Sequence, residues 1–403
     1  MTYRCLNDGT VTSPRGFAAG ATLANIGDYK ERAFDLGILR SDELCTTAGV
    51  FTTNAVKAAP VLVCQERVAR RRARAIVANS GYANTCTGQQ GHADAQQMAA
   101  LAAGKVGVAP DDVLVASTGV IGTCLPMDRI VQGIERIEVS PQGGNDFARA
   151  IMTTDTVPKE VAVSVDIDGK EVRIGGVAKG AGMIHPNMAT MLCFITTDAD
   201  VDGEFLQMAL RRSVDKSFNM ITVDGDTSTN DMVLVMANGL AGNSTLVSDS
   251  PGAERFEAAL DAVCTYLAKC IARDGEGSTK FIEVTVEGAE SLEDARKAAR
   301  AVAGSFLVKT AVCGMDPNWG RVVAAVGRSG AGVAESKLDL YLGDLCLVKG
   351  GCAVQFDVQY AQEIMSRDEV PFRVCLNLGG NEATAWGCDL TEEYVSINAE
   401  YTT

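Results

Sequence analysis

The residues best suited to chemistry stand in one short stretch, the string GGVAKGAGMIHPNMATMLCFITTDA from 175 to 199. Its glycines leave room for a backbone to approach a ligand closely, and Lys179 supplies a cation within this glycine-rich loop. Thr190 begins a nearly continuous apolar run that is typical of a buried strand. A hydroxyl at the first residue of a strand is rigidly held, so Thr190 is a candidate nucleophile, although threonine is also an ordinary strand former.

Further strings are dense in hydroxyls, carboxylates and glycines. In STGVIG, at 117–122, we expect a strand to break into Thr118-Gly119, which offers a hydroxyl and a backbone N–H that could stabilise an oxyanion. The others are MTTDT at 152–156, VDGDTSTND at 223–231 and RDGEGSTK at 273–280. Each of them could equally be a simple turn, because these residue types are turn formers.

Histidine is scarce, and this limits the chemistry. The chain has 2 histidines, His92 and His185, and no C-x-x-C pair, so neither a histidine-rich metal site nor a common zinc framework can be built. We therefore expect no metal. His92 falls at the start of an alanine-rich surface helix, and His185 is most simply a loop residue. A nucleophile in this chain is expected to use another base.

Composition limits the partners. The 403 residues carry a net charge of −15, and nothing basic is clustered beyond 70–74, which argues against nucleic acid and anionic membranes. No apolar run reaches the roughly 18 residues of a membrane span, and the N-terminus has no signal-peptide pattern. The 13 scattered cysteines are typical of reduced thiols in a cytoplasmic protein. Small polar metabolites are the expected ligands.

The elements that must position these residues alternate along the chain. Strands are predicted at 60–64, 74–80, 112–117, 160–178, 190–199, 280–288, 337–351 and 372–380, with a hairpin turn at Asp168-Gly169. Helices are predicted at 203–214 and 252–273, from 88 onward, and after Ser291, which with Asp294 resembles a capping box. The pattern predicts an α/β fold with layered, partly antiparallel sheets and covering helices.

Several of these strings together resemble one enzyme family. They are KGAGMIHPNMATML at 179–192, STGVIG, MTTDT, SFNMITVDGDTSTND, VKTAVCGMDPNWGR and the C-terminal NAEYTT. They closely resemble the ornithine acetyltransferase family of arginine biosynthesis, also called glutamate N-acetyltransferases. The resemblance runs from the first hundred residues to Thr403 and so covers essentially the whole chain.

The resemblance implies a fold and a maturation step. The implied fold is a layered α/β/β/α sandwich of the self-cleaving, N-terminal-nucleophile-like type, with two interwoven lobes. The implied cut lies between Ala189 and Thr190 and gives an alpha chain, 1–189, and a beta chain, 190–403, which assemble as two copies of each. Thr190 would then carry a free α-amino group with a pKa near about 7.7–8.0, able to act as the base for its own hydroxyl.

The resemblance also implies a reaction. By a ping-pong mechanism, N-acetylornithine would acetylate Thr190, ornithine would leave, and glutamate would collect the acetyl group. Thr118 and Gly119 match the family's oxyanion hole, and the positions matching substrate-binding residues are Thr156, Lys179, Thr190, Glu276, Asn398 and Thr403. Lys179 can meet an α-carboxylate and Glu276 an ammonium. No cofactor is implied, and acetyl-CoA is a possible second acetyl donor.

Two alternatives come from other functional classes. A self-processing aminopeptidase or amidohydrolase of the same fold type would pass the acyl group to water, and glutamate would then not accelerate ornithine release. A non-catalytic amino-acid-binding protein would never cut itself, which the intact Thr190 and its oxyanion partners argue against.

Overall fold

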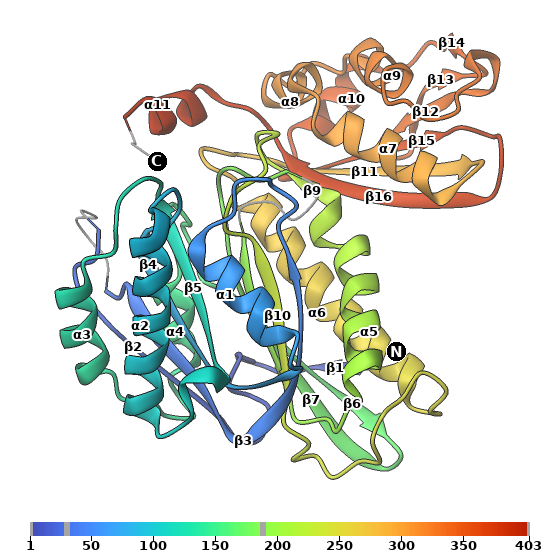
Figure 1. Ribbon diagram of the computed structural model, residues 1–403. Coiled ribbons are helices and arrows are strands. Elements are labelled where there is room, and N and C mark those ends of the chain that lie inside the picture. Colours follow the sequence, from blue (N-terminus) through green and yellow to red (C-terminus); the bar gives the residue numbers. More distant parts are fainter. Residues whose placement is uncertain (1–2, 28–32, 186–190, 401–403) are drawn as a thin grey trace.

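The larger of the two β-sheets in the described residues forms the centre of the larger lobe (Figure 1). The structure is a computed structural model that describes residues 3–27, 33–185 and 191–400. Within those residues, nine strands form this sheet in the order β1-β6-β7-β8-β10-β3-β4-β5, with β2 paired to β3. The strands are β1 (Tyr3–Cys5), β2 (Phe17–Thr22), β3 (Leu36–Phe51), β4 (Arg72–Tyr82), β5 (Val113–Val120), β6 (Lys159–Ile167), β7 (Lys170–Lys179), β8 (Leu192–Thr197) and β10 (Met232–Ala237).

Helices cover both faces of this sheet. One face carries α1 (Ala59–Val68), α2 (Gly88–Val106), α3 (Met127–Arg136) and α4 (Gly144–Ala150), and the other carries α5 (Gly203–Lys216) and α6 (Ala253–Arg273). Along β8 the alternating side chains divide between two cores, because Phe194 packs with the first group of helices and Ile195 with the second. A strand that is buried on both faces reads as a continuous apolar run, as this one does.

A second sheet lies in the smaller lobe, at the top of Figure 1. Among the described residues it has seven strands in the order β14-β13-β12-β15-β11-β16-β9. They are β9 (Ile221–Thr222), β11 (Phe281–Ala289), β12 (Asp339–Leu342), β13 (Leu345–Lys349), β14 (Cys352–Ala353), β15 (Glu369–Cys375) and β16 (Asn381–Cys388). The helices of this part are α7 (Leu292–Ala303), α8 (Phe306–Cys313), α9 (Trp319–Gly327), α10 (Val358–Met365) and α11 (Glu392–Glu400). In the described chain as a whole, short 3₁₀ helices lie at Pro110–Asp112, between α2 and β5, and at Phe218–Met220 and Glu335–Lys337.

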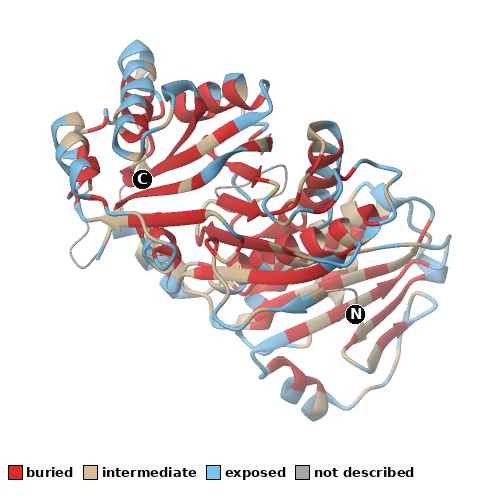
Figure 2. Ribbon diagram, turned by 90° about the horizontal axis from the view of Figure 1, so that it is seen from below, coloured by how far each residue is buried: buried red, intermediate tan, exposed pale blue. Residues whose placement is uncertain are grey.

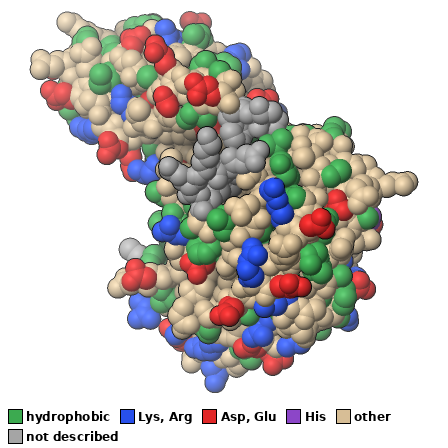
Figure 3. Space-filling view, turned by 90° about the vertical axis from the view of Figure 1, so that its left-hand side faces the viewer, with side chains coloured by type: hydrophobic (Ala, Val, Ile, Leu, Met, Phe, Trp, Pro, Cys, Tyr) green, Lys and Arg blue, Asp and Glu red, His purple; other side chains and the backbone are tan. Residues whose placement is uncertain are grey.

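One of the two hydrophobic cores, the one beneath α5 and α6, extends through both lobes. Val263 of α6 and Phe281 of β11 belong to the same buried cluster, which extends from the larger sheet into the smaller lobe. Figure 2 shows both sheets largely buried, with the exposed residues concentrated on the outer sides of the helices and in loops. On the face shown in Figure 3, basic and acidic side chains are interspersed, and the basic side chains form no continuous patch.

Most of the predicted elements are confirmed, including the mixed α/β architecture with two sheets. The predicted helices are α2, α5, α6 and α7, and Ser291 caps α7 by accepting a hydrogen bond from the N–H of Asp294 at 3.1 Å. Asp168 and Gly169 form the turn between β6 and β7 with φ angles of 53° and 77°. Both angles are positive, as a type I′ hairpin requires.

The strand predicted at 60–64 is wrong, because this segment lies in helix α1. Pro60 stands in the first turn of the helix, where its missing N–H costs nothing. Val61, Cys64 and Val68 are buried at helical spacing. A five-residue apolar run is too short for its periodicity to separate a strand from a helix.

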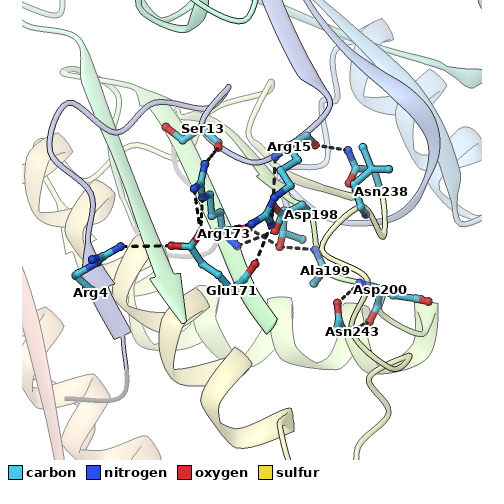
Figure 4. A network of polar contacts seen from close by, with 12 residues as sticks. Arg4, Ser13, Arg15, Glu171, Arg173, Asp198, Ala199, Asp200, Asn238 and Asn243 are labelled. Atoms are coloured by element: carbon cyan, nitrogen blue, oxygen red, sulfur yellow. Dashed lines mark hydrogen bonds and ion pairs between the residues drawn. The ribbon is translucent and has the colours of Figure 1, made fainter. Parts of the chain in front are cut away.

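A polar network joins the N-terminal segment to the middle of the chain (Figure 4). Asp198, whose side chain is fully buried, accepts hydrogen bonds from the Arg15 guanidinium at 2.6 Å and from the backbone N–H of Arg173 at 2.7 Å. Glu171 pairs with Arg4, Arg15 and Arg173 at 3.3, 3.4 and 2.9 Å. The network therefore connects residues on both sides of the Ala189–Thr190 bond.

Candidate functional site

A cavity of about 450 Å³ lies where several of the singled-out loops meet. Its volume falls in the usual range for a small-molecule site. Its lining comes from the end of β5, the end of β7, the loops around 153, 182 and 224–230, the turn after α6, and α11. The lining residues are Asn54, Ala83, Thr118, Gly119, Ile121, Thr153, Thr154, Lys179, Gly182, Met183, Asp224, Asp226, Thr227, Ser228, Thr229, Asn230, Glu276, Tyr394 and Asn398.

Thr118 and Gly119 lie side by side at the cavity, close to the end of β5. The sequence predicts that the strand breaks at these two residues. In the structure the strand instead continues to Val120. Gly119 has a φ of +126° and lies against Gly81 of β4, so closely that a Cβ would overlap the Gly81 backbone. Only glycine fits there. Thr118 is buried, and its hydroxyl oxygen accepts a hydrogen bond from the Lys179 ammonium at 3.4 Å.

Lys179 is a buried cation, not the solvated loop residue that its sequence neighbourhood allows. It is the last residue of β7 and is 2% exposed. Its ammonium donates to the Thr153 hydroxyl at 2.7 Å. Nearby, Asp155 accepts from the Gly180 N–H and from the Lys159 ammonium, both at 2.6 Å. Burial opposes ionisation of Asp155, but the charges of Lys159 and Lys179 outweigh it and hold its pKa well below the usual range.

Thr156 lies beside the cavity and does not line it. Its side chain is exposed and donates to a carboxylate oxygen of Asp274, and its N–H donates to the other oxygen at 3.0 Å. Asp274 in turn accepts from the Lys159 ammonium at 2.6 Å. The same loop contributes Thr153 and Thr154 to the lining in its place. The sequence pattern MTTDT could not distinguish among its three threonines.

Another part of the cavity lining carries an acidic group held by α11. Asn398 of α11 donates to a carboxylate oxygen of Glu276 at 2.8 Å, and the Glu276 N–H donates to the Ala181 carbonyl at 2.9 Å. Burial and the nearby carboxylates of Asp224 and Glu276 raise the pKa of Tyr394, a lining residue that lies in none of the candidate motifs. The cavity thus faces Lys179 on one element and Glu276 on another.

Two buried aspartates hold the chain near the expected cleavage site. Asp224 accepts from the N–H groups of Met183 and Ile184 at 2.5 and 2.9 Å. Asp231 is fully buried and accepts from the N–H of Met191 at 2.9 Å. Burial raises the pKa of both carboxyls. Both aspartates lie in the string 223–231, whose sequence pattern predicts no particular role for either of them.

The remaining expected site residues Ala189, Thr190 and Thr403 lie outside the described residues. His185 is half-buried, and one ring nitrogen lies 3.3 Å from the Thr222 hydroxyl. Burial, together with the charge of Arg300, lowers the pKa of this histidine.

Neither a metal-ligand cluster nor a membrane-spanning helix is present among the described residues. In residues 3–27, 33–185 and 191–400, no three or more His, Cys, Asp or Glu side chains are grouped as metal ligands. Over the same ranges, no helix is both long and apolar enough to cross a membrane.

Comparison with known proteins identifies the family. The model of the ArgJ family matches residues 20–403. Two relatives named arginine biosynthesis bifunctional protein ArgJ are similar over nearly the full length. The one from Symbiobacterium thermophilum is 56% identical over 98% of this chain and 99% of its own, and the one from Dehalococcoides mccartyi is 53% identical over 99% and 98%.

A solved structure of the protein of that name from Bacillus halodurans is 48% identical, with a TM-score of 0.51. The match covers 52% of this chain and 98% of the solved one. The family model and the relatives that match over nearly the full length agree with the motifs found in the sequence. The chain therefore belongs to the ArgJ family.

Proposed function

We propose that this chain is an acetyltransferase of arginine biosynthesis that moves the acetyl group from N-acetyl-L-ornithine to L-glutamate. One observation carries the proposal: a single cavity is lined by the Thr118-Gly119 pair, the Lys179 cation and the Glu276 carboxylate. Donor and acceptor are both amino acids, so each brings an α-carboxylate, and ornithine also brings an ammonium group. A cavity with both signs of charge suits such ligands.

The catalytic cycle begins at Thr190. Its free α-amino group takes the proton of its hydroxyl, and the hydroxyl oxygen attacks the acetyl carbon of N-acetylornithine. The C–N bond then breaks, the proton passes to the departing amine, and ornithine leaves an acetyl ester on Thr190. The amine of glutamate attacks this ester, and its proton returns to the Thr190 oxygen by way of the α-amino group. The Thr118 hydroxyl and the Gly119 N–H stabilise the oxyanion in both halves.

We propose that the Thr190 hydroxyl also cleaves the chain and so produces the mature enzyme. Attack on the carbonyl carbon of Ala189 replaces the peptide bond by an ester, and water hydrolyses that ester to give 1–189 and 190–403. The length of the solved relative supports this proposal, because a chain that matches 52% of this one has the size of one such piece. Two copies of each piece are proposed to form the active assembly. The thirteen free thiols support a reducing, cytoplasmic location.

Lys179 and Glu276 each have a proposed partner on the substrates. Lys179 binds an α-carboxylate, and Glu276 binds the ornithine ammonium with Asn398 fixing the carboxylate from α11. Thr156 and Thr403 complete the proposed set. The relatives' description as bifunctional supports a second activity, and we propose acetyl-CoA as the second acetyl donor.

Ornithine release tests the proposal. The purified protein is incubated with N-acetylornithine, with and without glutamate, and free ornithine and N-acetylglutamate are measured. The proposal predicts that glutamate accelerates ornithine release and that N-acetylglutamate forms in equal amount. Ornithine release at a rate independent of glutamate would instead identify a hydrolase. Tight binding of either amino acid, without turnover, by a chain that stays uncut would indicate a binding protein.

A further inference from the structure

One side chain of the loop 223–231 reaches the end of β5. Asn230 is 4% exposed and lines the cavity. Its Nδ2 group donates to the carbonyl of Ala83 at 2.6 Å and to the carbonyl of Ser117 at 2.8 Å. Ala83 comes directly after β4, and Ser117 is the residue before Thr118 in β5. The amide therefore connects this loop to two neighbouring strands of the larger sheet.

The side-chain amide of Asn230 uses its full capacity for hydrogen bonds. Besides the two bonds that Nδ2 donates, Oδ1 accepts from the hydroxyls of Thr85 at 2.8 Å and of Thr229 at 2.5 Å. Carbonyl oxygens only accept and hydroxyls can donate, so these four partners fix which way the amide faces. Because no donor or acceptor of this amide is left for a substrate, its effect must pass through the residues that it holds.

The two bonds that the amide donates hold the chain on both sides of Thr118 and Gly119. The Ser117 carbonyl and the Thr118 N–H belong to one planar peptide group, so holding the carbonyl fixes the orientation of that plane. On the other side, the N–H of Ala83 donates to the carbonyl of Val120 at 2.9 Å. The amide thus holds the residue before the pair directly and the residue after it through Ala83.

We propose that Asn230 is a positioning residue for acetyl transfer, whose amide holds the Thr118 hydroxyl and the Gly119 N–H in place for the oxyanion. This rests on the proposed function, in which that pair stabilises the oxyanion. Donors that are already in place need no rearrangement when the charge develops. Asn230 lies in 190–403 and the pair lies in 1–189, so one piece of the proposed mature enzyme holds the oxyanion site of the other.

Asn230→Asp tests the proposal, with Asn243→Asp as the matched control. Aspartate keeps the shape of asparagine but turns a second oxygen toward the two carbonyls, so the end of β5 must shift. Asn243 is also buried, at 7% exposed, and donates to the carbonyls of Asp200 and Ser244 at 3.1 and 2.8 Å. Unfolding in denaturant should show similar losses of stability for both variants, because each replaces a buried amide by a carboxyl.

The kinetics of the two variants should differ. We expect Asn230→Asp to lower kcat for glutamate-dependent ornithine release about 10²-fold, because a small displacement of a catalytic group costs about that much. The value of kcat/KM for N-acetylornithine should fall by the same factor, since the lost positioning matters only in the transition state. Asn243→Asp should keep the wild-type kcat. A kcat of Asn230→Asp less than about tenfold below that of the control contradicts the proposal, and so does a raised KM with an unchanged kcat.

A second variant and a second measurement keep the test decisive. If Asn230→Asp does not fold, Asn230→Ala takes its place, because it removes both donors without adding a charge, and the same comparison applies. Hydrogen exchange of the backbone amides at 113–120, measured in the whole protein, needs no activity. Faster exchange there than in Asn243→Asp supports the positioning role, and equal exchange contradicts it. A wild-type protein that transfers no acetyl group would refute the proposed function alone, and the exchange rates would still decide whether Asn230 holds the end of β5.

Discussion

Replacing Gly119 by alanine tests the proposed oxyanion site with a single methyl group. Gly119 has a φ of +126°, which side-chain-bearing residues rarely adopt, and the new Cβ would lie less than 3 Å from the carbonyl carbon and oxygen of Gly81. These are backbone atoms of β4, paired in register with β5. They cannot rotate away as a side chain would, so the end of β5 must move and carry the Gly119 N–H with it.

The expected loss combines two effects. Holding a residue with a side chain in this backbone region costs roughly 1–3 kcal/mol of stability. Displacing one oxyanion donor costs about 10²–10³ in kcat, which corresponds to about 2.7–4 kcal/mol of transition-state stabilisation. We therefore expect Gly119→Ala to lower kcat at least about a hundredfold. Self-cleavage should slow as well, because it passes through an oxyanion of the same kind.

Gly122→Ala is the matched control, three residues further along the same segment. Its φ is +88°, but no heavy atom lies within 4 Å of the added Cβ. It should therefore lose stability by strain alone and keep most of its activity. Both variants are assayed for glutamate-dependent ornithine release and for unfolding in denaturant. The reasoning fails if Gly119→Ala keeps more than about a tenth of the wild-type kcat, since loss of one donor costs at least 10²-fold.

Three further predictions follow from the charges around the cavity. Lys159→Met removes the ammonium shared by the buried carboxylates of Asp155 and Asp274, and should lower the free energy of unfolding by about 3–5 kcal/mol in denaturant titrations; an unchanged unfolding midpoint would contradict this. The lowered pKa of Asp155 means that its contribution to stability is present above the unfolded pKa and is lost as pH falls toward the folded one, so Lys159→Met should begin to unfold in acid at a higher pH than the wild type. Glu276→Gln should raise KM for N-acetylornithine about tenfold or more, and Asn398→Ala, which only frees that carboxylate, should raise it less; the reverse order in steady-state kinetics would reject the assignment.

Much of the fold could be predicted because its elements have strong local signals. Helix α6 shows apolar residues at helical spacing over 21 residues, and the β6–β7 hairpin has turn residues that tolerate positive φ. The error at 60–64 arose where the apolar run was short. Strands β3 and β10 were not singled out, although both lie in the middle of the larger sheet. Their positions depend on pairing partners far away in the sequence, which local patterns do not reveal.

Prediction of the site from the sequence has the same limits. Motif strings located the cavity, because loops rich in Gly, Thr and Asp gather there. They could not show that Lys179 is buried, or that Thr153 lines the cavity while Thr156 binds Asp274. Those facts depend on which way each side chain of a loop faces. The contact of Asp231 was equally hidden, because it accepts a hydrogen bond from the backbone N–H of Met191, forty residues away in the sequence.

The most direct test of the account is intact mass and N-terminal sequencing of the purified protein beside its Thr190→Ala variant. The account predicts that the wild-type chain separates into two pieces of similar length, the larger beginning Thr-Met-Leu-Cys, and that the variant stays whole. A wild-type chain that is folded and uncut would have no free α-amino group at Thr190. The proposed base would then not exist, and the mechanism would be wrong.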